Sequence, residues 1–271
     1  MLISLVIYVV NKNRFPDPAK KENSNADTVS AVSREDIKMS ATEIKQRIYA
    51  LFAVFGVVIF FWLSFHQNGY SLTYFARDYV DLSVINIDLG FTQIKGAEIF
   101  QCVNPFFVVA LTPLIMWFFG MLKAKGKEPS TPMKIAIGMG IAALAYVFLM
   151  VFSLTLPAKD ALSSMTTAEI DAIRVTPWIM IGLYFILTVA ELFISPLGLS
   201  FVSKVAPKSM LGLCQGLWLA ATALGNLLLW IGPLMYNAWP IWQCWTVFFI
   251  VCLVSMGVML GMVKWLERVT K

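Results

Sequence analysis

Six long apolar segments follow one another along the chain, and short polar stretches separate them. We place these segments near residues 47–76, 98–122, 132–156, 176–203, 209–237 and 241–266. Each apolar run continues for about 20 residues, which is the length that a helix needs to cross ~30 Å of hydrocarbon. A membrane β-barrel would instead show alternating segments of about ten residues. The pattern therefore predicts an all-α integral membrane protein with six spanning helices.

Two different segments precede the first long run. Residues 1–10 are apolar but too short to span a bilayer. We interpret them as the end of a transmembrane helix whose beginning is missing, as a truncated gene model, a split gene or an excised fragment would produce. Residues 11–46 are polar and carry mixed charges, which predicts a cytoplasmic linker before the bundle at 47–271. Ser40 and Glu43 have the spacing of a capping box ahead of the first span.

The composition and the charge distribution agree with a membrane location. The 271 residues are 59% hydrophobic and 14% charged, whereas soluble domains are about 45–50% apolar and about 25% charged. Most of the 21 Lys and Arg residues fall on one side of the six predicted spans. The positive-inside rule then places both termini in the cytoplasm. The short loops suit a bacterial inner membrane, and the net charge of +5 reflects topology rather than nucleic-acid binding.

Glu191 is the only charged residue in the apolar run at residues 178–202. A charged side chain at the centre of a spanning helix costs about 2.5–3.5 kcal/mol on insertion scales. Ser195 lies four residues later on the same helix face, and Pro196 opens the helix beside it. Glu191 could hold a substrate cation, carry a proton or pair with a basic side chain, and we favour a functional role.

Three further polar groups interrupt the apolar segments. They are Trp62 with His66, Gln101 with Asn104 and Pro105, and the stripe of Gln215, Trp218, Thr222 and Asn226. The first two pairs have spacings that place their members on one helix face, and a histidine can gain or lose a proton near neutral pH. The stripe is expected to face protein or water rather than lipid. Structural interpretations remain open for all three: a hydrogen-bonded histidine, interhelical hydrogen bonds and an aromatic packing seam.

Other motifs favour structure over chemistry. Gly212 and Gly216, and likewise Gly257 and Gly261, are spaced four apart, which predicts close helix contacts. Catalysis is not expected, because the sequence has one histidine, no Gly-x-Ser-x-Gly motif and no clustered cysteines and histidines. The four cysteines form no C-x-x-C pair, so neither a metal site nor a disulfide framework is supported.

These groups, in this order, resemble the C-terminal half of the proton-dependent oligopeptide transporter family, within the major facilitator superfamily. The stretch from Glu191 to Pro207 is similar to the family's tenth-helix signature. Residues 61–67 resemble the seventh helix, 101–105 the eighth and 218–226 the eleventh. Residues 1–10 resemble the end of the sixth helix. The resemblance implies six helices from the C-terminal half of a major-facilitator fold, preceded by a helix remnant.

The resemblance also implies a function, the proton-driven import of di- and tripeptides with protons as coupling ion and no other cofactor. It implies these substrate-binding residues: Glu191, Ser195, Asn104, Gln101, Trp62 and Trp218. Glu191 would bind the peptide ammonium, Asn104 the peptide backbone, and the two tryptophans would line side-chain pockets. His66 stands where many members carry an acid. Histidine also titrates, so proton coupling would rest on His66 together with Glu191, or it would be weakened or carried mainly by the other half of the transporter.

The family's N-terminal six helices, with their Glu-x-x-Glu-Arg proton motif, have no counterpart in this sequence. We therefore expect that half as a partner, alongside the lipid bilayer and a peptide substrate, and we expect the chain alone not to transport. Two alternatives stay open. One is a facilitator for another small solute, such as nitrate, a sugar or a drug, and the other is a non-catalytic membrane subunit.

Overall fold

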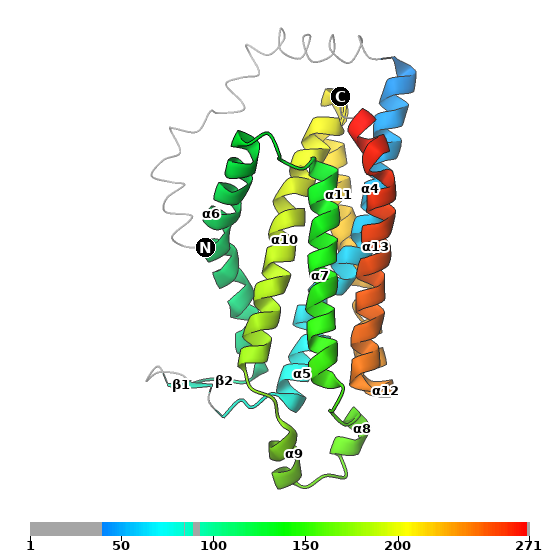
Figure 1. The fold of residues 1–271 in the computed structure, drawn as a ribbon. Coiled ribbons are helices and arrows are strands. Elements are labelled where there is room, and N and C mark those ends of the chain that lie inside the picture. Colours follow the sequence, from blue (N-terminus) through cyan, green and yellow to red (C-terminus); the bar gives the residue numbers. More distant parts are fainter. Residues whose placement is uncertain (1–39, 84, 89–92, 270–271) are drawn as a thin grey trace.

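Six helical segments, each long and apolar enough to cross a membrane, make up most of the protein (Figure 1). The structure is a computed structural model that describes residues 40–83, 85–88 and 93–269. The segments are Ala41–Tyr79, Ala97–Ala124, Thr131–Ser153, Trp178–Val205, Lys208–Ala238 and Ile241–Val269. The six predicted spans and the all-α membrane architecture are therefore confirmed. The predicted helix remnant at residues 1–10, and the linker up to residue 39, lie outside the described residues.

Several spans are built from more than one helix. The α-helices are α4 (Ala41–Phe65), α5 (Ser71–Tyr79), α6 (Val103–Ala124), α7 (Thr131–Ser153), α8 (Lys159–Leu162), α9 (Thr167–Ile173), α10 (Trp178–Val205), α11 (Leu211–Leu227), α12 (Ile231–Ala238) and α13 (Ile241–Val269). Short 3₁₀ helices η2 (His66–Gly69), η3 (Ala97–Cys102) and η4 (Lys208–Met210) adjoin them. The apolar pattern did not predict the antiparallel hairpin of β1 (Asn86–Asp88) and β2 (Gln93–Lys95), because strands of three residues are too short to show a period.

The first span begins at Ala41, earlier than the predicted residue 47, so the last residues of the predicted linker are helical. Ser40 is the N-cap, and its hydroxyl oxygen accepts a hydrogen bond from the Glu43 backbone N–H at 3.2 Å. This contact satisfies one of the donors that every helix start leaves without an intrahelical partner. The Glu43 carboxylate pairs with Arg47 one turn later, at 3.1 Å. The predicted N-cap at Ser40 is thus confirmed.

Helix α7 lies at the centre of the packing and contacts α10 and α13, while α4 contacts α11 and α13. Buried hydrogen bonds also join these helices: Trp245 of α13 donates from Nε1 to the Ser153 hydroxyl of α7 at 3.1 Å, and Tyr146 of α7 donates to the Ser64 carbonyl of α4.

Helix α6 differs from the other spanning helices. It packs against α10 and has no buried residue among those the structure describes. A spanning helix with so little cover has faces available to lipid or to a further protein segment.

The predicted glycine contacts are wrong, and other glycines take that role. A Cβ added at Gly212, Gly216, Gly257 or Gly261 would meet no described atom within 4 Å. These four residues lie on exposed faces of α11 and α13, which a spacing motif cannot reveal. Close approaches occur at several other glycines, among them Gly138, where a Cβ would come within 2.7 Å of Ile194, and Gly225, where it would come within 2.7 Å of the Ile59 carbonyl. These glycines bring α7 against α10 and α11 against α4.

The two ends of the bundle carry different elements. α4 begins and α13 ends at the same end, and the connection between α6 and α7 lies there too (Figure 1). The opposite end holds α5, α8, α9, α12 and the β1–β2 hairpin. Lys134 anchors the first end: it is 5% exposed, and its ammonium pairs with Glu128 at 2.5 Å while lying over the Phe119 ring. Six crossings therefore return the chain to the end from which α4 starts.

Candidate functional site

The centre of the candidate site is a contact between α6 and α10. Asn104, in the first turn of α6, donates from Nδ2 to Glu191 Oε2 at 3.0 Å and to Thr188 Oγ1 at 3.3 Å. Glu191 and Asn104 are both partly buried. Both residues were singled out in the sequence, and the structure brings them into direct contact. The other carboxylate oxygen, Oε1, and the amide oxygen of Asn104 accept no hydrogen bond from the described residues.

Two prolines lie next to the contact between Asn104 and Glu191, and neither breaks the helix that contains it. Pro105 falls in the first turn of α6, where a backbone N–H has no intrahelical acceptor in any case, so its ring is tolerated there. Pro196 lies inside α10, which runs unbroken from Trp178 to Val205. Because Pro196 has no N–H, the carbonyl of Leu192 one turn earlier loses its helical partner. That freed carbonyl adds a further acceptor one residue after Glu191.

Ser195 lies one helical turn after Glu191 and is partly buried. No hydrogen bond joins its hydroxyl to the carboxylate. The hydroxyl therefore keeps both its proton and its lone pairs for another partner, since α10 holds it on the same face as Glu191. Glu191 and Ser195 therefore lie one turn apart on α10, as predicted, but their side chains do not form a hydrogen bond with each other among the described contacts.

Trp62 and His66 form the second part of the candidate site. Their rings stack with centroids 4.8 Å apart and an interplanar angle of 15°, as their shared helix face predicted. Trp62 Nε1 and His66 Nδ1 are both buried, and neither has a hydrogen-bond partner among the described residues. Asn226 of α11 lies beside the imidazole. Buried polar atoms are nearly always paired, so two neighbouring orphans indicate a place for a ligand or for water.

Gln101 was predicted to lie beside Asn104 in the site, but in this structure its side chain contacts a different part of the protein. It lies in the 3₁₀ helix η3 rather than in α6, and it is exposed. Its Nε2 donates to Thr73 Oγ1 at 3.3 Å, whereas Asn104 bonds to α10. The expectation that Gln101 and Asn104 project together assumed one continuous α-helix. The change from 3₁₀ to α geometry at Val103 turns the two side chains toward different neighbours.

Trp218 packs between helices in this structure. The residue is 2% exposed, and its indole meets the Phe55 ring edge-on with centroids 6.2 Å apart. The indole also lies over Gly198 of α10. One turn earlier, Gln215 donates to the Ser203 hydroxyl of α10 at 3.2 Å. The polar and aromatic stripe of α11 therefore faces protein at these two positions, as predicted, while Asn226 at its far end is exposed.

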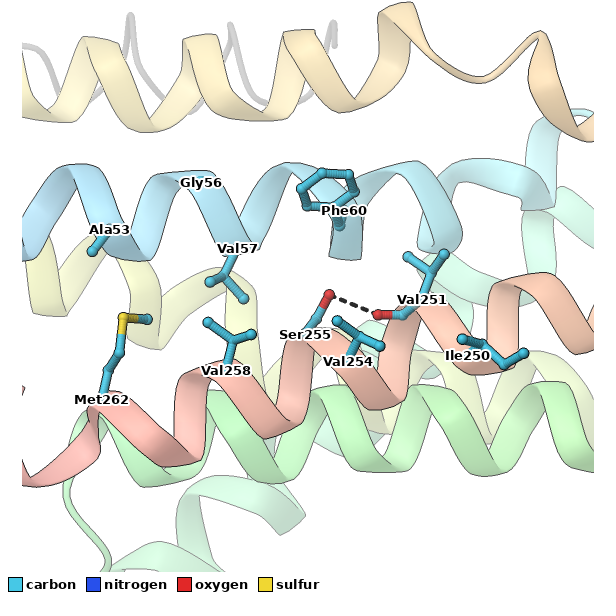
Figure 2. Close-up of a pocket in the computed structure, with 10 residues that line it drawn as sticks. All are labelled: Ala53, Gly56, Val57, Phe60, Ile250, Val251, Val254, Ser255, Val258 and Met262. Carbon is cyan, nitrogen blue, oxygen red and sulfur yellow. Dashed lines mark hydrogen bonds between the residues drawn. The ribbon is translucent and has the colours of Figure 1, made fainter.

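A separate apolar groove of about 600 Å³ lies between α4 and α13 (Figure 2). Its walls are Ala53, Gly56, Val57, Phe60, Ile250, Val251, Val254, Ser255, Val258 and Met262. The one side-chain hydroxyl there, that of Ser255, already donates to the Val251 carbonyl at 2.8 Å, as the dashed line shows. With no charge and no unpaired polar side chain, this groove suits an apolar occupant.

A bundle of six helices that are long and apolar enough to span a membrane defines a multi-pass membrane protein, and a carboxylate–amide pair lies between two of these helices. The model of the POT family matches residues 3–238, and the chain therefore belongs to the POT family. This confirms the resemblance found in the sequence motifs.

Named relatives agree with that assignment. The chain is 32% identical over 190 residues to the peptide transporter YePEPT of Yersinia enterocolitica, covering 70% of this chain and 34% of the relative. It is 27% identical over 248 residues to the dipeptide and tripeptide permease B of Shigella dysenteriae, covering 87% of this chain and 46% of the relative. The chain thus spans about a third to a half of the length of these relatives.

Solved structures share the fold. A variant of the peptide transporter POT in complex with alafosfalin superposes with a TM-score of 0.69 at 21% identity, covering 100% of this chain and 60% of that one. A POT family transporter in complex with a thioalcohol conjugated peptide superposes with a TM-score of 0.61 at 21% identity, covering 100% and 52%. The predicted half of a major-facilitator fold is therefore confirmed.

Proposed function

We propose that this chain forms one wall of a proton-coupled importer of di- and tripeptides. The observation that carries the proposal is the contact between Asn104 and Glu191, which presents hydrogen-bond acceptors inside a membrane bundle. The names of the relatives, a peptide transporter and a dipeptide and tripeptide permease, support the choice of substrate. They favour peptides over nitrate, sugars or drugs, which were the open alternatives.

The free acceptors of this pair match the ammonium group of a peptide. An ionised carboxylate only accepts hydrogen bonds, and a primary ammonium only donates them. Glu191 Oε1 and the Asn104 amide oxygen, with no donor from the described chain, would both accept from that group. The opposite charges attract more strongly in a partly buried site than in water. Ser195, one turn along α10, would contact the next part of the ligand.

The peptide carboxylate would be bound outside the described chain. Transporters of this fold bind substrate between two six-helix halves that rock around it. The open faces of α6, with no buried residue among those described, are where the second half would pack. That half would supply the cations for the carboxylate, and both termini of this chain would lie in the cytoplasm of a bacterial inner membrane.

Proton coupling would use His66 and Glu191. The imidazole of His66 changes charge when it gains or loses a proton, and its Nδ1 is an unpartnered buried atom. Protonation of His66, or of a group in the second half, would bias rocking toward the inner face. Trp62, stacked on His66, would line a side-chain pocket beside it. Trp218 would act by packing, since it is 2% exposed.

The test is the substitution Glu191→Gln in this chain, produced in membrane vesicles together with a six-helix N-terminal half. Uptake of radiolabelled dialanine is followed under an inward proton gradient. We expect uptake to fall at least about tenfold, because an amide cannot pair with the substrate ammonium. The matched control is Glu128→Gln, at the end of the bundle. Uptake at the unmodified rate in Glu191→Gln would contradict the proposal, and competition by other solutes but not by dipeptides would contradict the substrate class.

A further inference from the structure

Thr188 is a buried hydroxyl in α10, three residues before Glu191, and no motif in the sequence drew attention to it. It is 0% exposed and shares a hydrogen-bonding partner, Asn104, with Glu191. We propose that Thr188 is a positioning residue that fixes the orientation of the Asn104 side-chain amide and thereby sets the selectivity of the site for a free amino group. This inference rests on the proposed peptide function.

Which group donates in the contact between Thr188 and Asn104 follows from the number of protons that each side chain carries. The Thr188 hydroxyl donates its single proton to the Tyr184 carbonyl at 2.7 Å. Its oxygen can therefore only accept from Asn104. The partner atom must be a donor, so Asn104 turns its NH₂ group toward α10, with 3.3 Å between Nδ2 and Thr188 Oγ1. The amide oxygen is left on the side away from these two contacts.

Glu191 cannot hold this orientation alone. An ionised carboxylate accepts from the NH₂ group, but a protonated one can donate to the amide oxygen instead. A carboxylate that has turned to a bound ammonium also releases its amide contact. Either event would allow the Asn104 amide to rotate by half a turn. The proton of Thr188 is committed to α10 in every such state, so Thr188 keeps the NH₂ group where it is.

The fixed amide defines what the site accepts. With both protons of the Asn104 NH₂ group directed at α10, the atoms offered to a ligand are two acceptors, the amide oxygen and Glu191 Oε1. A free ammonium satisfies both acceptors. An acetylated amino terminus has one N–H and a carbonyl oxygen, and that oxygen would face acceptors without a proton between them, which is unfavourable in a partly buried site. Thr188 therefore acts on selectivity through Asn104, without touching the ligand.

The first test needs no ligand. The 271-residue chain is labelled with ¹⁵N-asparagine in lipid nanodiscs, and the side-chain NH₂ signals of Asn104 are assigned by their loss in Asn104→Ala. We expect exchange of these protons with solvent to be about three- to tenfold faster in Thr188→Val, which keeps the shape but removes the acceptor. Thr188→Ser should restore the slow exchange, and Thr188→Ala serves as a second variant without the hydroxyl. Equal exchange in all variants would overturn the proposal.

The second test measures selectivity. Binding of dialanine and of N-acetyl-dialanine is titrated on the same variants, each assembled with a six-helix N-terminal half, and the ratio of their dissociation constants is compared. Thr188→Val should reduce the preference for the free amine by about three- to tenfold, and Thr188→Ser should keep it. An unchanged ratio in Thr188→Val would overturn the role of Thr188 and leave the peptide function standing. Binding of neither peptide by the unmodified chain assembled with the N-terminal half would contradict the peptide function, whereas the exchange measurement tests Thr188 independently.

Discussion

Gly198 and Trp218 fit into one another across the contact between α10 and α11. A Cβ built on Gly198 would lie 2.0 Å from the outer edge of the Trp218 indole, well inside any normal contact distance. The ring has no room to retreat, because its other side meets Phe55 of α4. One missing methyl group thus permits three helices to close around one aromatic side chain, next to the turn of α10 that carries Ser195.

Gly198→Ala should therefore loosen the bundle. The added methyl must displace a rigid ring that is 2% exposed, and overpacking of this kind costs about 1–3 kcal/mol. We expect a lower unfolding temperature for the purified chain in detergent. Gly212→Ala is the matched control, because a Cβ there meets nothing within 4 Å and alanine favours a helix by ~1 kcal/mol over glycine. Equal stability of Gly198→Ala and the parent would show that the indole moves freely.

Asn104 and Gln101 should respond differently to truncation, although the sequence ranked both as substrate-binding residues. Asn104→Ala removes both contacts to α10, and a hydrogen bond to a charged group contributes about 1.5–3 kcal/mol. We expect dialanine uptake at low substrate concentration to fall roughly tenfold or more. Gln101→Ala removes one exposed contact to Thr73 and should stay within about twofold of the parent. Equal losses of uptake in the two variants would instead support the sequence-based assignment of both residues to the substrate site.

The overall fold could be predicted from the sequence because spanning helices are specified by length and hydropathy, which are local properties. The same holds for the cap at Ser40, where the deciding hydrogen bond joins residues three apart. The first span nevertheless begins at Ala41 rather than residue 47, since a helix extends past the apolar run wherever a cap allows it. The pattern of apolar residues does not show how far a helix extends beyond the apolar run.

The candidate site could be predicted only in part, because its geometry depends on which helices meet. Glu191 was conspicuous as a charge in an apolar run, but its partner 87 residues away follows from packing. Thr188 was missed because a threonine in a spanning helix usually bonds to its own helix, as this one also does. Its second contact, to Asn104, has no local signature. The glycine predictions were wrong for the same reason: spacing does not show which face of a helix meets a neighbour.

The ion pair of Glu128 and Lys134 should make stability depend on acid pH. The hydrogen bond from Lys134 lowers the pKa of the Glu128 carboxyl below its ordinary value of 4.5. A lowered folded-state pKa stabilises the protein fully above pH 4.5, and that contribution is lost as the pH falls through the lower value. Glu128→Gln should reduce stability by about 1 kcal/mol at pH 7, because the buried ammonium of Lys134 loses the negative charge of its partner and keeps only a neutral acceptor. It should also flatten the acid side of the unfolding-temperature profile, whereas an unchanged profile would contradict the pairing.

His66 should couple transport to the proton gradient without being needed to bind peptide. Glutamine at this position can still hydrogen-bond but cannot titrate, so His66→Gln should lower uptake driven by a proton gradient severalfold. Exchange of labelled for unlabelled dialanine, measured without any gradient, should change little, because the Asn104–Glu191 contact is intact. Trp62→Phe is the control: it keeps an aromatic ring beside His66 and removes the unpartnered Nε1–H together with the second ring of the indole. Equal losses of driven uptake and of exchange in His66→Gln would indicate a binding role instead, and unchanged driven uptake would place coupling in the other half.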